Sequence, residues 1–242
     1  MDWSDDAIVL AVRPFGEHGA ILETLTRTHG RHLGLMRGAG SRGMRGALEP
    51  GNLLSVQWRA RMDNQLGSFS AEIAAARAAH FFEDRLKLDG LAAACAMACA
   101  TLPEREVHER VFLALDGLLQ HMVLEPSIGW VASYVRFELV LLEDLGFGLD
   151  LDSCAVTGER ENLAYVSPRS GRAVTAAGAG VFANRLLRLP GFLFDPAAPV
   201  DGQTLGLGLG LTAHFLERFL AEAHGKGLPE ARLRFGQRVE KG

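Results

Sequence analysis

The sequence of 242 residues contains little cysteine and little lysine. Three cysteines, at positions 95, 99 and 154, are too few for a disulfide framework, which indicates a reducing compartment. Only three of the 25 basic residues are lysine, so almost all positive charge is carried by guanidinium groups. Guanidinium binds phosphate through paired hydrogen bonds and stacks on bases. A GC-rich genome would also favour arginine, so the positions of the arginines are more informative than their number.

Long hydrophobic runs and a basic leader are also missing. The nearly uncharged stretch at residues 91–102 ends before Pro103 and is shorter than the ~20 residues that a membrane span needs. The first residues, MDWSDD, are acidic, so no secretory signal is predicted. Apolar residues (48%) and charged residues (22%) have the proportions of a folded soluble domain. We therefore predict a soluble cytoplasmic protein that does not associate with membranes.

Motifs for catalysis and for metal binding are not found. The sequence has no G-x-S-x-G, H-E-x-x-H or P-loop pattern, which predicts a protein that is not an enzyme. Cys95 and Cys99 are one helical turn apart among alanines, without a second ligand pair, and are predicted to be buried free thiols. Cys154 stands alone, with Thr157 where a C-x-x-C motif would have its second sulfur.

Acidic residues are nearly absent from one part of the chain. The net charge of the whole protein is −4, but residues 26–61 hold seven arginines and one acid, Glu49. Such a local excess of positive charge is typical of surfaces that bind a polyanion. The arginines predicted to contact nucleic acid are those of the N-terminal quarter: Arg13, Arg27, Arg31, Arg37, Arg42, Arg45, Arg59 and Arg61.

Gly38, Gly40 and Gly43 form a G-x-G-x-x-G pattern within this basic segment. A dinucleotide-binding loop would need a helix directly after it and a βαβ pattern, whereas Gly46 and Pro50 interrupt any helix here. The dinucleotide interpretation is therefore disfavoured against two others: a mobile surface loop, or a flexible basic loop whose glycines let the backbone approach phosphates.

The pattern of hydrophobic residues changes from period two to period 3.6 near residue 72. Residues 7–13, 20–26, 31–37, 53–61 and 65–73 alternate as strands, and five strands this short favour a small closed or half-closed barrel. Trp58 has the parity of the core residues, and Arg59 points the other way. The predicted helices cover residues 71–87, 91–101, 104–124, 127–145, 179–188 and 211–224, with glycines 206–210 as a linker and an irregular segment at 149–180.

Four segments together resemble the RecO family of recombination-repair mediators. They are residues 7–61, with the RGAGSR loop and ALEP; residues 139–149 (LVLLEDLGFGL); residues 165–174 (YVSPRSGRAV); and residues 211–220 (LTAHFLERFL). The resemblance implies an α+β protein with a five-stranded OB-fold at residues 1–75. A mostly helical domain at residues 76–242 follows, with a zinc-finger-like insert at about 149–180.

The resemblance also implies a function. Family members bind single- and double-stranded DNA, anneal strands and help to load RecA with RecR and RecF, and they contact the C-terminal tail of the single-stranded-DNA-binding protein. A nucleoid-associated location during repair is expected accordingly. Because only Cys154 of the family's four cysteines is present, the zinc site is predicted to be lost and no cofactor is expected. The alternative is an interaction scaffold whose barrel has little affinity for DNA.

Overall fold

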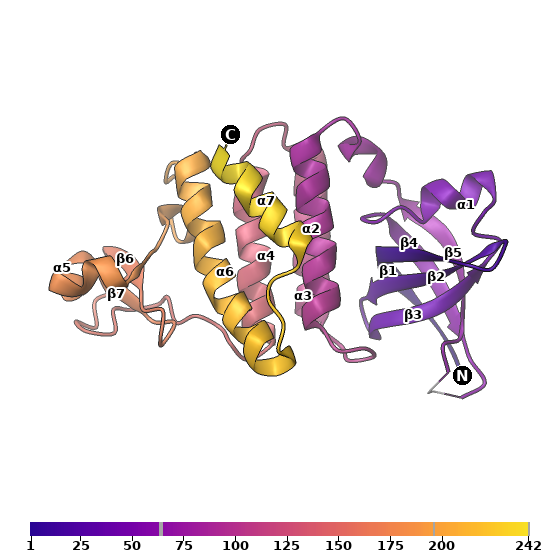
Figure 1. The fold of residues 1–242 in the computed structure, drawn as a ribbon, viewed down its shortest axis with the longest axis horizontal. Helices are drawn as coiled ribbons and strands as arrows, with labels where there is room; N and C mark the ends of the chain where they lie inside the picture. Colours follow the sequence, from indigo (N-terminus) through magenta and orange to yellow (C-terminus); the bar gives the residue numbers. More distant parts are fainter. Residues whose placement is uncertain (63–64, 196, 242) are drawn as a thin grey trace. The chain divides into compact units, whose positions relative to one another are not determined.

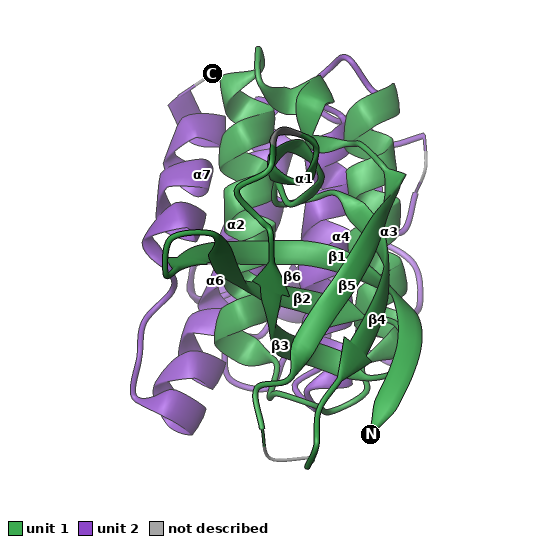
Figure 2. Cartoon of the chain, turned by 90° about the vertical axis from the view of Figure 1, so that its right-hand side faces the viewer, with its two compact units in different colours: residues 1–124 green, residues 125–242 purple. Residues whose placement is uncertain are grey.

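The computed structural model describes residues 1–62, 65–195 and 197–241. The chain divides into two compact units, residues 1–124 and residues 125–242 (Figure 2). The elements of the first unit are β1 (Asp2–Phe15), β2 (Gly19–Thr26), β3 (Gly30–Arg37), α1 (Arg42–Ala47), β4 (Leu53–Arg59), β5 (Ser68–Ala75), η1 (Ala78–Phe81), α2 (Arg85–Thr101) and α3 (Glu109–Leu124). Those of the second are α4 (Trp130–Asp144), β6 (Leu163–Val166), β7 (Ala173–Thr175), α5 (Ala176–Ala179), η2 (Gly180–Arg185), β8 (Leu187–Arg188), η3 (Gly191–Leu193), α6 (Gly202–His224) and α7 (Glu230–Lys241).

Strands β1 to β5 form a closed barrel in the order β1-β2-β3-β5-β4 (Figure 1). The first half of β1 pairs with β4 and its second half with β2, and the register shifts between Val9 and Ala11. Strands β3 and β5 pair in parallel, whereas the other neighbours are antiparallel. The five-stranded barrel predicted from the sequence is confirmed.

The barrel interior is packed around Trp58, whose side chain is 2% exposed, as its parity predicted. The indole Nε1 donates hydrogen bonds to the carbonyls of Leu33 and Leu66, at 3.3 and 3.2 Å. Two glycines leave room for this ring. A Cβ at Gly67, which has a φ of +68°, would lie 2.4 Å from the indole, and one at Gly34 would lie 2.6 Å from the Phe69 ring. Any larger residue at either position would displace an aromatic ring from the core.

Helix α2 covers one side of the barrel and contacts β1. Its N-cap, Asp84, accepts hydrogen bonds from the backbone amides of Leu86 and Lys87. The prediction of a helix over residues 71–87 is wrong, because β5 continues to Ala75 and pairs with Leu53 of β4. Pairing within the barrel has overridden the helix propensity of the alanines. Pro103 lies outside α3, which begins six residues later.

The second unit contains α4, α6, α7 and a small sheet in the order β7-β6-β8. The glycine run predicted to be a linker lies inside α6, where a Cβ at Gly208 would meet Phe192 at 2.9 Å and Val135 at 3.1 Å. Glycine here allows α6 to approach α4 closely. The C-terminal residues, for which no element was predicted, form α7, and its buried Arg232 donates two hydrogen bonds to Glu138.

Candidate nucleic-acid interface

Three of the predicted arginines line one wide, shallow concavity of about 850 Å³ on the barrel. We call this concavity the arginine groove; Arg37, Arg59 and Arg61 contribute its positive charge. The strand order brings them together. Ser68, the first residue of β5, pairs with Leu35 on β3 on one side and with Arg59 on β4 on the other. The C-terminal ends of β3 and β4 therefore flank the first residue of β5, one on each side.

The guanidinium groups of the arginine groove are accessible. Arg37 and Arg61 are exposed, and within the described residues neither forms an ion pair. The nearest carboxylate to Arg59 is that of Asp2, with an N–O distance of 3.9 Å, and both side chains are about two-thirds exposed. An exposed pair at this distance contributes little energy, so Arg59 remains able to bind an anion.

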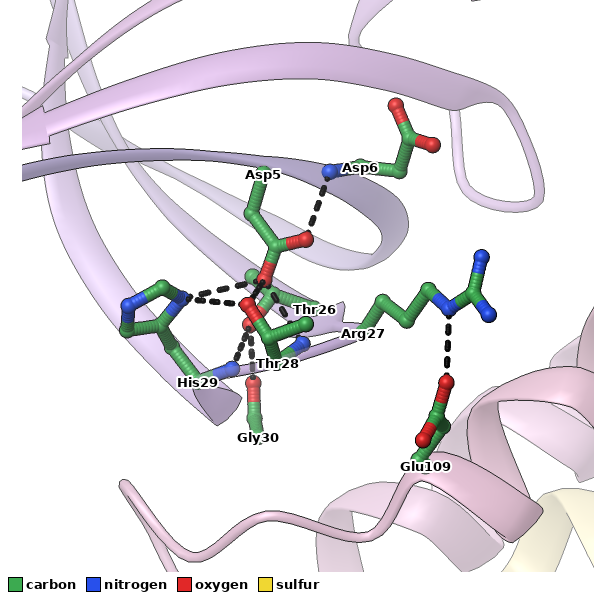
Figure 3. A network of polar contacts seen from close by, with 8 residues as sticks. All are labelled: Asp5, Asp6, Thr26, Arg27, Thr28, His29, Gly30 and Glu109. Carbon is green, nitrogen blue, oxygen red and sulfur yellow. Dashed lines mark hydrogen bonds and ion pairs between the residues drawn. The ribbon is translucent and has the colours of Figure 1, made fainter.

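Three other arginines that were predicted to contact nucleic acid instead form ion pairs with carboxylates. Arg27 donates a 2.8 Å hydrogen bond to Glu109 of α3 (Figure 3). The side chain of Arg31 is 14% exposed and donates hydrogen bonds to Glu23 at 2.5 Å and to the carbonyl oxygen of Leu102 at 2.7 Å. Arg13 lies 3.3 Å from the same Glu23, although its own side chain is largely exposed. These arginines stabilise the unit and do not line the arginine groove.

The glycine-rich segment contains a short helix, α1, where a loop was predicted. Gly38 has a φ of +70° and begins the turn that precedes α1. Arg45 of α1 is exposed and lines a separate concavity of about 500 Å³ that also contains Glu17 and Glu49. The side chain of Arg42 lies outside the described residues. Because β4, which follows α1, pairs with β1 and β5 and not with β3, the segment is no βαβ dinucleotide motif.

Arg105 is a basic residue near the groove that the sequence did not indicate. It lies in the connection between α2 and α3, has a φ of +64°, and donates a 2.7 Å hydrogen bond to the carbonyl of Gln65. Its guanidinium carbon is 5.8 Å from the centroid of the Trp58 ring. A left-handed backbone is unusual for arginine, and no pattern of residues predicts it.

The segment predicted to be a zinc-finger-like insert, at about residues 149–180, does not offer the ligands that zinc requires. Cys154 is its one cysteine. Burial raises the pKa of this thiol, but hydrogen bonds from Thr157 and Thr175 outweigh burial and lower the pKa to about 6. The sulfur accepts from the backbone amides of these threonines at 3.4 and 3.2 Å. Over the residues that the structure describes, no group of three or more histidine, cysteine or acidic side chains is placed to hold a metal. One sulfur among hydroxyl and amide groups does not fit a structural zinc ion.

The described part of the chain also has no helix that is long and apolar enough to cross a membrane. The closed five-stranded barrel and its arginine groove define an OB-fold protein with an exposed basic surface.

Comparisons with known proteins agree with this class. Residues 1–77 match the family described as "Recombination protein O N terminal", and residues 83–227 match "Recombination protein O C terminal". Three proteins named DNA repair protein RecO are similar to this chain over its whole length. The protein of Rhodospirillum rubrum is 45% identical to it, that of Rhodospirillum centenum 47% and that of Cereibacter sphaeroides 46%. Each alignment covers 100% of this chain and 97%, 96% and 100% of the respective relative. The chain belongs to the RecO family of DNA repair proteins.

Proposed function

We propose that the protein is a non-catalytic mediator of recombinational repair that binds single- and double-stranded DNA through the arginine groove. It promotes annealing of complementary strands and assists the loading of RecA together with RecR and RecF. The observation that carries this proposal is the convergence of Arg37, Arg59 and Arg61 on one accessible surface of an OB-fold barrel. Membership of the RecO family supports it.

The mechanism requires no bond to be made or broken in the DNA. Guanidinium groups at the ends of β3 and β4 bind phosphate oxygens and release condensed counterions. Neutralised backbones repel each other less, so two strands held on the same protein can approach and pair. A shallow groove suits this role, because it binds the backbone without enclosing the bases of a duplex.

The partners we propose are those of the family. RecR and RecF act with the protein on DNA, and the C-terminal tail of the single-stranded-DNA-binding protein directs it to coated strands. A nucleoid-associated location during repair follows from these partners.

The experiment that tests the DNA-binding proposal is a salt titration. Fluorescence anisotropy of a labelled single strand is measured at several salt concentrations with wild type and with R37A/R59A/R61A. Each lost phosphate contact flattens the slope of log K against log[salt] by roughly 0.7 to 0.9, so the triple variant is expected to lose about two units of slope. Affinity should fall similarly for strands of unrelated sequence.

The matched control is R85A/R160A/R169A, which removes the same three charges from exposed positions outside the arginine groove. This control should retain most of the wild-type slope. Equal slopes for wild type and the groove variant would contradict the proposal. A uniform decrease in both triple variants would show that net charge, rather than the groove, determines binding.

A second candidate function is a protein-interaction scaffold, favoured by an apolar groove of about 600 Å³ in the first unit. The groove is formed mainly by β1 and α2, with Leu10, Val12, Leu91 and Phe82 among its lining residues. A scaffold would bind RecR or the tail peptide with unchanged affinity in the R37A/R59A/R61A variant and would show no salt-dependent DNA binding in the wild type.

A further inference from the structure

A cavity of about 360 Å³ in the first unit lies next to the arginine groove, and Met1 lines both. Three of its rings form one stack. Trp3 is stacked on Trp58, with centroids 5.5 Å apart, and on His29, with centroids 4.1 Å apart and planes inclined by 7°. His32 meets both tryptophans edge-on, at 5.0 and 4.8 Å. We call this cavity the aromatic pocket. Its size is within the range of small-molecule sites.

His32 is a polar group without a good partner in this pocket. The residue is 5% exposed, and neither ring nitrogen has a hydrogen-bond partner of normal geometry within the described residues. Burial and the nearby charge of Arg105 lower the pKa of His32 to about 4, although a contact with the backbone of His29 partly opposes this. The ring is therefore neutral at pH 7 and offers one donor and one acceptor. A buried polar group left unpaired costs free energy, which a ligand with a complementary polar edge would recover.

The remaining walls are held in place before any ligand binds. Asp5 accepts hydrogen bonds from the backbone amide and hydroxyl of Thr28, at 2.7 and 2.9 Å, and from Nδ1 of His29 at 3.0 Å (Figure 3). Burial raises the pKa of Asp5, but these hydrogen bonds outweigh it, and the net pKa lies below its usual value. The carboxylate is therefore ionised and fixes the ring of His29 against Trp3. A rigid wall of this kind lowers the entropic cost of binding.

Arg105 links the aromatic pocket to the arginine groove. Its guanidinium lies near Trp58 at the pocket and is hydrogen-bonded to the carbonyl of Gln65, which lines the groove. A strand whose phosphates lie along the groove would pass this point with its bases nearby. Arginine planes and aromatic rings are the surfaces on which unstacked bases are held in proteins that bind single strands.

We propose that the aromatic pocket receives one unstacked base of a single strand whose phosphates occupy the arginine groove. This inference rests on the proposed function, because the groove must first bind the strand. A nucleobase fits the observations better than an aliphatic ligand, since it combines a flat face with an edge that carries both donors and acceptors. A free nucleotide would offer the same chemistry, and the experiment distinguishes it from a base within a strand.

The test compares two labelled oligonucleotides of equal length and charge at one salt concentration. One carries normal bases, and the other carries abasic residues throughout its central part. Wild type is expected to bind the normal strand about tenfold more tightly, the effect of stacking one base on a protein surface. The normal strand should also quench tryptophan fluorescence, because Trp3 and Trp58 line the pocket.

The His32→Phe variant keeps an aromatic ring but removes both ring nitrogens, and Arg105→Ala removes the guanidinium from an exposed position. Both should lose most of the preference for the normal strand. His32→Phe should keep the salt slope of the wild type, whereas Arg105→Ala, which also removes a cation beside the groove, should flatten the slope by no more than about one unit. His80→Phe is the matched control on an exposed histidine outside the pocket, and it should keep the preference. Urea denaturation of His32→Phe shows whether it is folded, and Arg105→Ala tests the pocket independently.

The outcomes are distinguishable. Equal affinity of wild type for the two strands, with an intact salt slope, would overturn the base pocket and leave the proposed function standing. Absence of salt-dependent binding to either strand would remove the proposed function itself. An unchanged preference in both variants would also overturn the pocket, as would tight binding of free mononucleotides that the normal strand does not displace.

Discussion

Arg31 of β3 donates a hydrogen bond of 2.5 Å to Glu23 of β2, and the side chain of Glu23 is only 5% exposed. Arg37, six residues later on the same strand, is exposed and has no ion pair within the described residues. Two arginines from one basic segment therefore have different roles. Arg31 compensates a buried charge, whereas Arg37 is available to a ligand.

This difference predicts opposite effects of two single substitutions. Arg31→Ala removes the closest cation from the buried Glu23, which keeps the Arg13 contact at 3.3 Å and a hydrogen bond with the Cys99 thiol, so we expect it to lower the free energy of unfolding by about 3 kcal/mol. Arg37→Ala should change stability by less than about 0.5 kcal/mol and flatten the salt slope of DNA binding by roughly one unit. Urea denaturation and anisotropy titrations measure the two effects. A stable Arg31→Ala variant with a flattened salt slope, or an unstable Arg37→Ala variant with the wild-type slope, would contradict these roles.

Asp2 provides a second test, because its carboxylate is the acidic group that lines the arginine groove. Replacing it by asparagine removes a negative charge 3.9 Å from Arg59. We expect Asp2→Asn to tighten DNA binding about two- to fivefold at low salt, since an exposed charge interaction is worth roughly 0.5–1 kcal/mol. The gain should diminish as salt increases. Asp6→Asn, an exposed position on the same strand that does not line the groove, is the control and should have a smaller effect. Binding by Asp2→Asn that is unchanged would show that DNA does not pass Asp2, and weaker binding would contradict the predicted repulsion.

Much of the fold could be predicted from local patterns. Alternation of apolar residues located all five barrel strands, and helical periodicity located the central parts of α3, α4 and α6, because burial of one face leaves a regular trace in the sequence. The predictions failed where long-range packing decides. Residues 72–75 favour a helix locally but complete the ladder with β4, and the glycines of α6 permit close contact with α4.

The candidate site could be predicted only in part. The excess of arginine in residues 26–61 indicated a basic surface, and Arg37, Arg59 and Arg61 do meet in one groove. The sequence could not show which arginines are paired, because Glu23 and Glu109 reach them through the fold. Arg105 was missed for the same reason, since only the tertiary structure brings this distant loop residue to Trp58.

The lowered pKa of His32 predicts a pH dependence of stability. The folded pKa is about 4 and the ordinary value is 6.5, so between these values the unfolded chain binds a proton that the folded protein excludes. The free energy of unfolding should therefore fall as the pH decreases from about 6.5 to about 4. Below about pH 4 the contribution of His32 should not change further. Urea midpoints measured across this range in wild type and His32→Phe report the effect. The variant should show a shallower decline, whereas identical profiles would mean that His32 is protonated in the folded protein.

The insert around Cys154 predicts how the protein responds to zinc and to chelators. Thr157 and Thr175 both donate backbone hydrogen bonds to the sulfur, and a Cβ at Gly178 would lie 3.1 Å from it, so positions 154, 157, 175 and 178 converge with the spacing of two C-x-x-C motifs. We expect the thermal midpoint of the wild type to be unaffected by zinc or by EDTA, because hydrogen bonds replace the metal. The variant T157C/T175C/G178C should bind one zinc ion and gain a midpoint that rises with zinc and falls with EDTA. Gly178→Ala controls for crowding against the sulfur and should lower the midpoint without any response to zinc. A wild-type midpoint that falls on chelation would contradict this expectation and show that the protein holds a metal through a different set of ligands.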